Sequence, residues 1–245
     1  MRALLCDLDD TLFDHQQATR SALETLRTRD ARLQAWPLEE LKRRHHELLE
    51  RFHLEVMAGR LSIDEAREQR FSALVGGGDA SDLAQAYRDA YMEDWREVAG
   101  AAALLRLARA SGVPVVVVTN NIVSEQRKKL DRIGMTHLVD ALITSEEVGI
   151  QKPDPQIFKA ALDAAGVGPA DAVMLGDAWQ ADVLGARASQ IRPVWLNRHG
   201  LPLADDTVDV VTGLVPRDDV YSVICGERRS TSPRQSRPPQ AKSPQ

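Results

Sequence analysis

The chain has 245 residues, of which 43% are hydrophobic and 27% charged, and its formal net charge is -5. This balance is typical of a globular protein that buries a sizeable core, and it argues against a surface built to bind nucleic acid. No apolar run approaches the length of about 18 residues that a membrane span needs. The two cysteines lie far apart in the sequence, which predicts neither a disulfide scaffold nor a zinc site and favours a cytoplasmic location.

Six short apolar runs predict strands, and four segments with helical spacing lie between them. The predicted strands are residues 3–6, 113–118, 141–143, 172–175, 193–196 and 208–211. The predicted helices are residues 101–110, 124–133, 155–165 and 180–188. The apolar runs are continuous rather than alternating, as in strands that are buried on both faces. This order predicts an α/β fold: a Rossmann-like parallel sheet with helices on both faces.

Residues 15–98 interrupt that order because they contain no convincing strand. Leu83, Tyr87, Tyr91 and Trp95 recur at i, i+4, which is typical of one face of a helix. The triple glycine at 76–78 predicts a turn between two helices. We therefore predict an α/β core made of residues 1–14 and 99–226, with an inserted all-α domain at 15–98. The adjacent pair His45 and His46 lies among charged residues of this insert, and we expect both rings to be solvated.

The final segment, residues 227–245, has a different composition. It holds four Arg and one Lys against one Glu, together with four Pro and four Ser. Such a segment has too little apolar surface to offset the entropy lost on ordering, so we predict a disordered basic tail. We interpret it as solvated rather than as a tail that binds RNA or lipid.

Polar side chains follow four of the predicted strands. They are Asp7, Asp9 and Thr11 after the first strand, Thr119 and Asn120 after the second, Lys152 after the third, and Asp177 and Asp182 after the fourth. Ligands of open α/β sheets bind outside the carboxyl ends of the strands. The sequence therefore predicts that these residues converge on one site.

These segments resemble the four motifs of the haloacid dehalogenase-like hydrolase superfamily. Residues 7–12, Asp-Leu-Asp-Asp-Thr-Leu, resemble the first motif; Thr119 and Lys152 match the second and third; and residues 176–182 fit the fourth, Gly-Asp-x-x-x-x-Asp. The helical insert resembles the cap of many members. Segments 59–62 and 70–74 of the insert and segment 149–154 resemble the pyrimidine 5′-nucleotidase branch of the phosphatases.

The resemblance implies a Mg²⁺-dependent phosphomonoester hydrolase that forms an aspartyl phosphate. Asp7 suits the role of carboxylate nucleophile. A Mg²⁺ ion held by Asp7, the Asp9 carbonyl and Asp177 would cancel the repulsion between carboxylate and phosphate. We place Asp182 in the same metal site, where we expect it to orient a metal-bound water or Lys152.

The remaining motif residues have predicted roles in proton transfer and substrate binding. Asp9 is expected to protonate the leaving alkoxide and then to deprotonate water. Thr119, expected to open a helix, and Lys152 are expected to hold the phosphate. Thr11, Asn120 and Arg70 are the predicted substrate-binding residues. For Arg70 the sequence leaves two interpretations open, reaching the active site from the cap or forming a surface ion pair.

The favoured substrates are small phosphometabolites such as pyrimidine nucleoside 5′-monophosphates. Sugar phosphates and phosphoglycolate are alternatives, as are 2-haloacid dehalogenation, a phosphomutase reaction and a non-catalytic regulatory module. Asp9 argues against dehalogenation, because loss of halide needs no acid there. The filled catalytic positions argue against a regulatory module. The expected partner is a small phosphomonoester, with neither a nucleic acid polymer nor a membrane, and the sequence does not give the oligomeric state.

Overall fold

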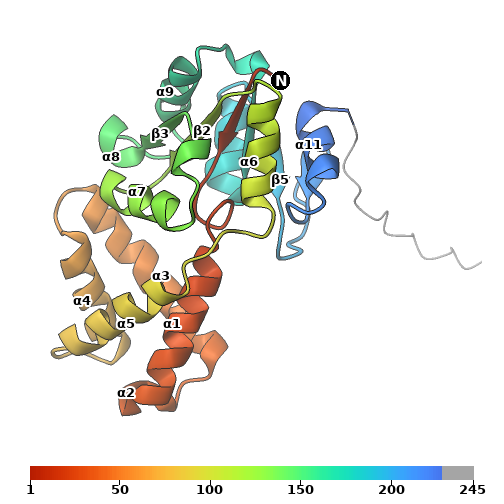
Figure 1. The fold of residues 1–245 in the computed structure, drawn as a ribbon. Helices are drawn as coiled ribbons and strands as arrows, with labels where there is room; N and C mark the ends of the chain where they lie inside the picture. Colours follow the sequence, from red (N-terminus) through yellow and green to blue (C-terminus); the bar gives the residue numbers. More distant parts are fainter. Residues whose placement is uncertain (228–245) are drawn as a thin grey trace, which may run out of the picture.

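The computed structural model describes residues 1–227 and contains a six-stranded sheet in the order β3-β2-β1-β4-β5-β6 (Figure 1). Every neighbouring pair of strands runs parallel. The strands are β1 (Ala3–Cys6), β2 (Val115–Thr119), β3 (Ala141–Thr144), β4 (Ala172–Gly176), β5 (Arg192–Leu196) and β6 (Asp209–Val211). Strands β1, β2 and β4 are buried along their whole length, as their continuous apolar runs require. The predicted fold class is confirmed.

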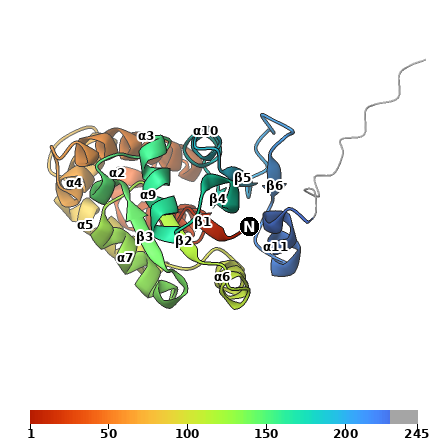
Figure 2. The ribbon, with the colours of Figure 1, turned by 90° about the horizontal axis from the view of Figure 1, so that it is seen from above.

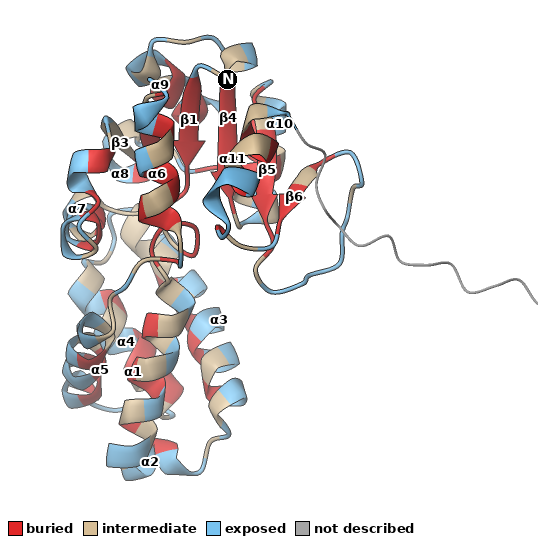
Figure 3. Ribbon diagram, turned by 45° about the vertical axis from the view of Figure 1, so that its right-hand side comes forward, coloured by how far each residue is buried: buried red, intermediate tan, exposed pale blue. Residues whose placement is uncertain are grey.

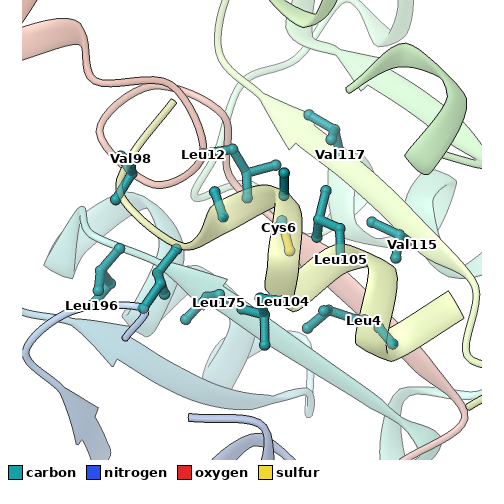
Figure 4. Close-up of a cluster of buried hydrophobic side chains, with 14 of the residues drawn as sticks. Leu4, Cys6, Leu12, Val98, Leu104, Leu105, Val115, Val117, Leu175 and Leu196 are labelled. Atoms are coloured by element: carbon teal, nitrogen blue, oxygen red, sulfur yellow. The ribbon is translucent and has the colours of Figure 1, made fainter. Parts of the chain in front are cut away.

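Helices cover both faces of this sheet (Figure 2). One face carries α6 (Ala101–Ala110), α7 (Val123–Arg132) and α11 (Arg217–Cys225), and the other carries α9 (Pro155–Ala165) and α10 (Gly185–Ala188). Figure 4 shows the first interface, where Leu104 and Leu105 of α6 lie against Leu4 and Cys6 of β1. No helix of the described part of the chain is long and apolar enough to cross a membrane.

Some local predictions differ from the structure. The predicted helix 180–188 is divided into a π-helix, Trp179–Leu184, followed by α10. Helix α11 and the four-residue α8 (Ser145–Val148) were not predicted, because short helices with few buried positions give little periodic signal. The predicted tail lies outside the described residues apart from Glu227.

The insert between β1 and α6 consists of helices alone. They are α1 (His15–Arg29), α2 (Ala31–Gln34), α3 (Leu38–Met57), α4 (Ile63–Leu74) and α5 (Ser81–Glu93). These helices bury their own apolar cluster, visible as the inward-facing buried positions in Figure 3. The predicted glycine turn joins α4 to α5, and all three of its glycines have positive φ. The insert covers the edge at which the strands end (Figure 1), and it is called the cap below.

One cap prediction is wrong. His46 is exposed as expected, but His45 is only 1% exposed and its ring packs against Phe71 and Tyr87 at 5.7 and 4.9 Å between centroids. The reason is its position, since it lies on the stripe of α3 that also buries Leu41, Leu48 and Phe52. Its charged neighbours Arg43, Arg44 and Glu47 are exposed. Burial lowers the pKa of His45 well below its usual value, so the ring is neutral.

Candidate active site

Three carboxylates gather where β1 and β4 end. Asp7 directly follows β1, Asp177 directly follows β4, and the two strands are neighbours in the sheet. The chain turns from one half of the sheet to the other between these strands, which is where ligands of such sheets bind. One carboxylate oxygen each of Asp7, Asp177 and Asp182 lies within 4.8 Å of the others. The predicted convergence of these residues is thus seen in the structure.

Lys152 joins two of these carboxylates. Its side chain is almost fully buried, and its Nζ lies 2.5 Å from Asp7 Oδ1 and 2.7 Å from Asp182 Oδ1. Burial by itself would lower the pKa of Lys152, but the charges of Asp182 and Asp7 more than offset this and raise it. Lys152 is therefore a protonated group fixed beside Asp7.

Asn120 fixes the loop that carries Lys152. The Asn120 amide donates to the Lys152 carbonyl at 2.9 Å and accepts from the Lys152 N–H at 2.7 Å. Both ends of the amide are thus engaged with the main chain of the third motif. This geometry makes Asn120 a positioning residue, and its predicted contact with substrate stays a prediction.

Asp9 is held by two residues of α7, a helix that the sequence predicted without singling out these side chains. The Nζ of Lys129 in α7 lies 2.5 Å from Asp9 Oδ1, and Gln126 Nε2 donates to Asp9 Oδ2 at 3.0 Å. Burial would raise the pKa of Asp9, but Lys129 is the main cause of a net lowering to about 2. The carboxyl group of Asp9 is therefore ionised at neutral pH.

Thr119 belongs to the same network, although its predicted place in the secondary structure is wrong. It is the last residue of β2, in register with Thr144 of β3, and α7 begins only at Val123. Pairing with β3 extends the strand through this position, so Thr119 does not open a helix. Its hydroxyl accepts a hydrogen bond from Gln126 Nε2 at 2.6 Å.

Sequence reasoning missed Gln126 and Lys129. A signal for Gln126 exists, because it is four residues before the buried Leu130 and thus lies on the apolar face of a predicted helix. Lys129 gives no comparable signal among the neighbouring basic residues of α7. Its role depends on a contact with Asp9, which lies 120 residues away in the sequence.

Thr11 and Trp195 fix Asp177. Thr11 is fully buried and its hydroxyl donates to Asp177 Oδ1 at 3.4 Å, while Trp195 Nε1 donates to the Asp177 carbonyl at 2.8 Å. The Thr11 hydroxyl therefore hydrogen-bonds to a carboxylate of the acidic cluster. A direct contact between Thr11 and substrate stays a prediction.

The acidic cluster fits a hard divalent cation. Burial raises the pKa values of Asp7 and Asp177, and the neighbouring carboxylates raise the pKa of Asp177 further. Three carboxylates against the single ammonium of Lys152 leave excess negative charge in a buried place, and the donors are all oxygens, as Mg²⁺ prefers. Asp182 is the least available of the three for binding a cation, because its two oxygens accept hydrogen bonds from Lys152 and from the Ala178 N–H.

The close approach of Gly176 to Asp182 gives a test of this packing. A Cβ on Gly176 would lie 2.5 Å from the Cβ of Asp182, whereas one on Gly168 would meet nothing within 4 Å. We expect Gly176→Ala to displace Asp182, to lower the free energy of unfolding by about 1–3 kcal/mol and to reduce activity, with Gly168→Ala unchanged. Chemical denaturation of both variants measures this. Equal stability of the two variants would contradict the packing described.

A cavity of about 110 Å³ lies between the cap and the core. Its lining includes Arg70 and Tyr91 from the cap, and Asn121 and Lys129 from the core. Arg70 is 7% exposed and makes no ion pair among residues 1–227, so the interpretation as a surface ion pair is wrong. One residue of the lining, Lys129, also contacts Asp9 of the first motif.

Comparisons with known proteins show the family to which the chain belongs. Residues 1–190 match the haloacid dehalogenase-like hydrolase family, and the chain belongs to that family. It is 35% identical to a phosphoserine phosphatase of Thermus thermophilus over 222 residues, covering 81% of this chain and 89% of that one. It is 35% identical to the pyrimidine 5′-nucleotidase YjjG of Escherichia coli over 118 residues, covering 48% and 52% of the two chains.

A solved structure shows the same fold over most of the chain. It is the magnesium-bound putative hydrolase YfnB of Bacillus subtilis, with a TM-score of 0.69 and 26% identity, covering 91% of this chain and 98% of that one. The resemblance expected from the sequence is thus confirmed. The protein is an enzyme of the phosphatase type within this family.

Proposed function

We propose that the protein is a Mg²⁺-dependent phosphomonoesterase of small phosphometabolites that works through an aspartyl phosphate on Asp7. The observation that carries this proposal is the buried pair of Asp7 and Lys152, 2.5 Å apart, beside Asp177. A carboxylate aimed out of the carboxyl end of β1 suits attack on phosphorus. The adjacent ammonium suits the phosphate oxygens, which carry negative charge throughout the reaction.

The first step is attack of Asp7 on the phosphorus atom, with loss of the substrate alkoxide. Asp7, Asp177 and Asp182 would hold Mg²⁺, which supplies positive charge that offsets the repulsion between carboxylate and phosphate. Lys152 orients Asp7 through the oxygen that it contacts and neutralises charge on the transferring group. Asn120 and Asp182 keep Lys152 in that place.

Asp9 carries the proton transfers of both steps. The pairing with Lys129 keeps it ionised in the free protein, which is the form that accepts a proton from water attacking the aspartyl phosphate. Protonation of the leaving alkoxide needs the acid form. A bound phosphate next to Asp9 favours that form, since a neighbouring negative charge raises the pKa of a carboxyl group.

The proposed test is phosphate release from a substrate panel in Mg²⁺. Two named relatives act on an amino-acid phosphate and on pyrimidine nucleotides, so O-phosphoserine, UMP, CMP, phosphoglycolate and sugar phosphates belong in the panel. We expect release from at least one of these substrates that requires both Mg²⁺ and Asp7. Absence of release from the whole panel by folded protein would favour the regulatory module over the enzyme.

The metal site gives a prediction on pH and stability. In metal-free protein the raised pKa values of Asp7 and Asp177 mean that ionisation disfavours the folded state, so stability falls as the pH rises above about 4, the usual pKa of Asp. Mg²⁺ binds the ionised carboxylates. We therefore expect Mg²⁺ to raise the thermal midpoint more at pH 8 than at pH 5. Thermal melts with and without Mg²⁺ measure this, and an increase that is equal at both pH values, or that persists in Asp177→Asn, would contradict the site.

A further inference from the structure

Arg70 is a buried cation without a partner for its charge. It lies in α4, and within the described residues it forms no ion pair, while its Nε is buried without a hydrogen bond. Its guanidinium lies over the rings of Phe71 and Tyr87, at 5.6 and 5.2 Å from their centroids. Burial lowers its pKa to about 10, which still leaves it protonated at neutral pH. A buried and unpaired charge lowers the stability of the folded protein. The presence of Arg70 therefore points to a bound ligand that supplies the opposite charge.

The surroundings of Arg70 differ from those of the other charged groups in the cavity lining. Lys129 is paired with Asp9, Arg67 with Asp64, and Glu125 with Lys128. Arg70 is thus the one charged lining residue of the described chain that has no charged partner. Tyr87 and Tyr91 form an aromatic wall beside it.

Lys129 links the cavity that Arg70 lines to the proposed reaction centre. Lys129 lines the cavity and contacts the carboxylate that we assign to protonate the leaving group. We therefore infer that a substrate whose phosphate lies at Asp7 places its leaving group beside Asp9 and towards the cap. At about 110 Å³ the cavity is smaller than the roughly 300–1,000 Å³ of pockets for drug-sized ligands, which favours a short leaving group.

Resting on the proposed phosphatase function, we propose that Arg70 determines specificity by binding a carboxylate on the leaving group of the substrate. The substrate class is a short phosphomonoester of a hydroxy acid or a hydroxy amino acid. A planar guanidinium matches a planar carboxylate through two parallel hydrogen bonds, and such a pair is strongest where water is excluded.

The experiment compares two substrates that differ only in the carboxylate, O-phosphoserine and O-phosphoethanolamine, with p-nitrophenyl phosphate as a substrate that lacks an anionic tail. We expect the wild type to prefer O-phosphoserine, and Arg70→Gln to lower kcat/KM for it by about 10- to 100-fold. Hydrolysis of the other two substrates stays within about twofold. Arg70→Lys keeps the charge without the planar fork and recovers only part of the preference.

A matched control and a folding measurement separate specificity from structure. Arg88→Gln removes another cap arginine, which binds Asp64 outside the cavity lining, and should behave as the wild type. The thermal midpoint of Arg70→Gln should change little, because the lost contacts with the Phe71 and Tyr87 rings are offset by removal of a buried charge that has no ionic partner. Equal losses on all three substrates would assign Arg70 a structural role and overturn the proposal.

Other outcomes distinguish this inference from the proposed function. Hydrolysis of p-nitrophenyl phosphate without any preference for O-phosphoserine overturns the carboxylate assignment alone. The same conclusion follows if UMP or fructose 1,6-bisphosphate is the better substrate and Arg70→Gln leaves it unaffected. No hydrolysis of any substrate overturns the phosphatase proposal, and the role of Arg70 falls with it.

Discussion

Replacement of Asp7 by Asn is expected to lower phosphate release by at least about 10⁴-fold, because an amide is a very poor nucleophile and cannot form the acyl phosphate. The substitution keeps the size of the side chain and leaves Lys152 its second partner, Asp182. The expected loss is therefore one of chemistry rather than of folding. Steady-state phosphate release, with thermal melts to check folding, measures it.

Asp163 provides the matched control for this variant. Its carboxylate lies at the surface in an ion pair with Lys159 of α9, away from the acidic cluster. Asp163→Asn should retain the activity of the wild type, because an exposed ion pair of this kind contributes little to the stability of the fold. Substantial turnover by Asp7→Asn would show that another residue, or water, attacks the phosphorus atom.

Replacement of Asp9 by Asn should slow the reaction of alkyl phosphates more than that of aryl phosphates. The variant keeps the backbone carbonyl of residue 9 and loses the proton donor and acceptor, so alkyl phosphates should react about 10²–10⁴-fold more slowly. An aryl phosphate has a leaving group that needs little protonation, so it should still phosphorylate Asp7. Comparison of rates for O-phosphoserine and p-nitrophenyl phosphate in the first turnover measures the difference. Equal losses on both substrates would contradict the assigned role.

The residues that sequence reasoning placed correctly share a simple position in the chain. Asp7 and Asp177 directly follow buried strands, and the apolar runs that define those strands are visible in the sequence. Parallel strands bring their carboxyl ends to one edge, so the convergence of these residues follows from the order of the elements. Lys152 could be assigned to the same site because its motif lies after the third strand.

The residues that were missed or misplaced depend on contacts between distant elements. Lys129 of α7 contacts Asp9, which lies 120 residues away in the sequence, and nothing in its own segment distinguishes Lys129 from its basic neighbours. His45 appears polar in sequence, yet its helical position places it on the buried stripe of α3. For Arg70 two interpretations were open, and only the packing of α4 against α5 separates them.

Rapid-quench mass spectrometry with p-nitrophenyl phosphate tests the central claim most directly. The claim predicts a phosphate group on the peptide that contains Asp7. It should be transient in the wild type and should accumulate in Asp9→Asn, where the base that activates water is missing. Phosphate release without any phosphorylated peptide, or phosphate on a residue other than Asp7, would contradict the proposed aspartyl-phosphate mechanism.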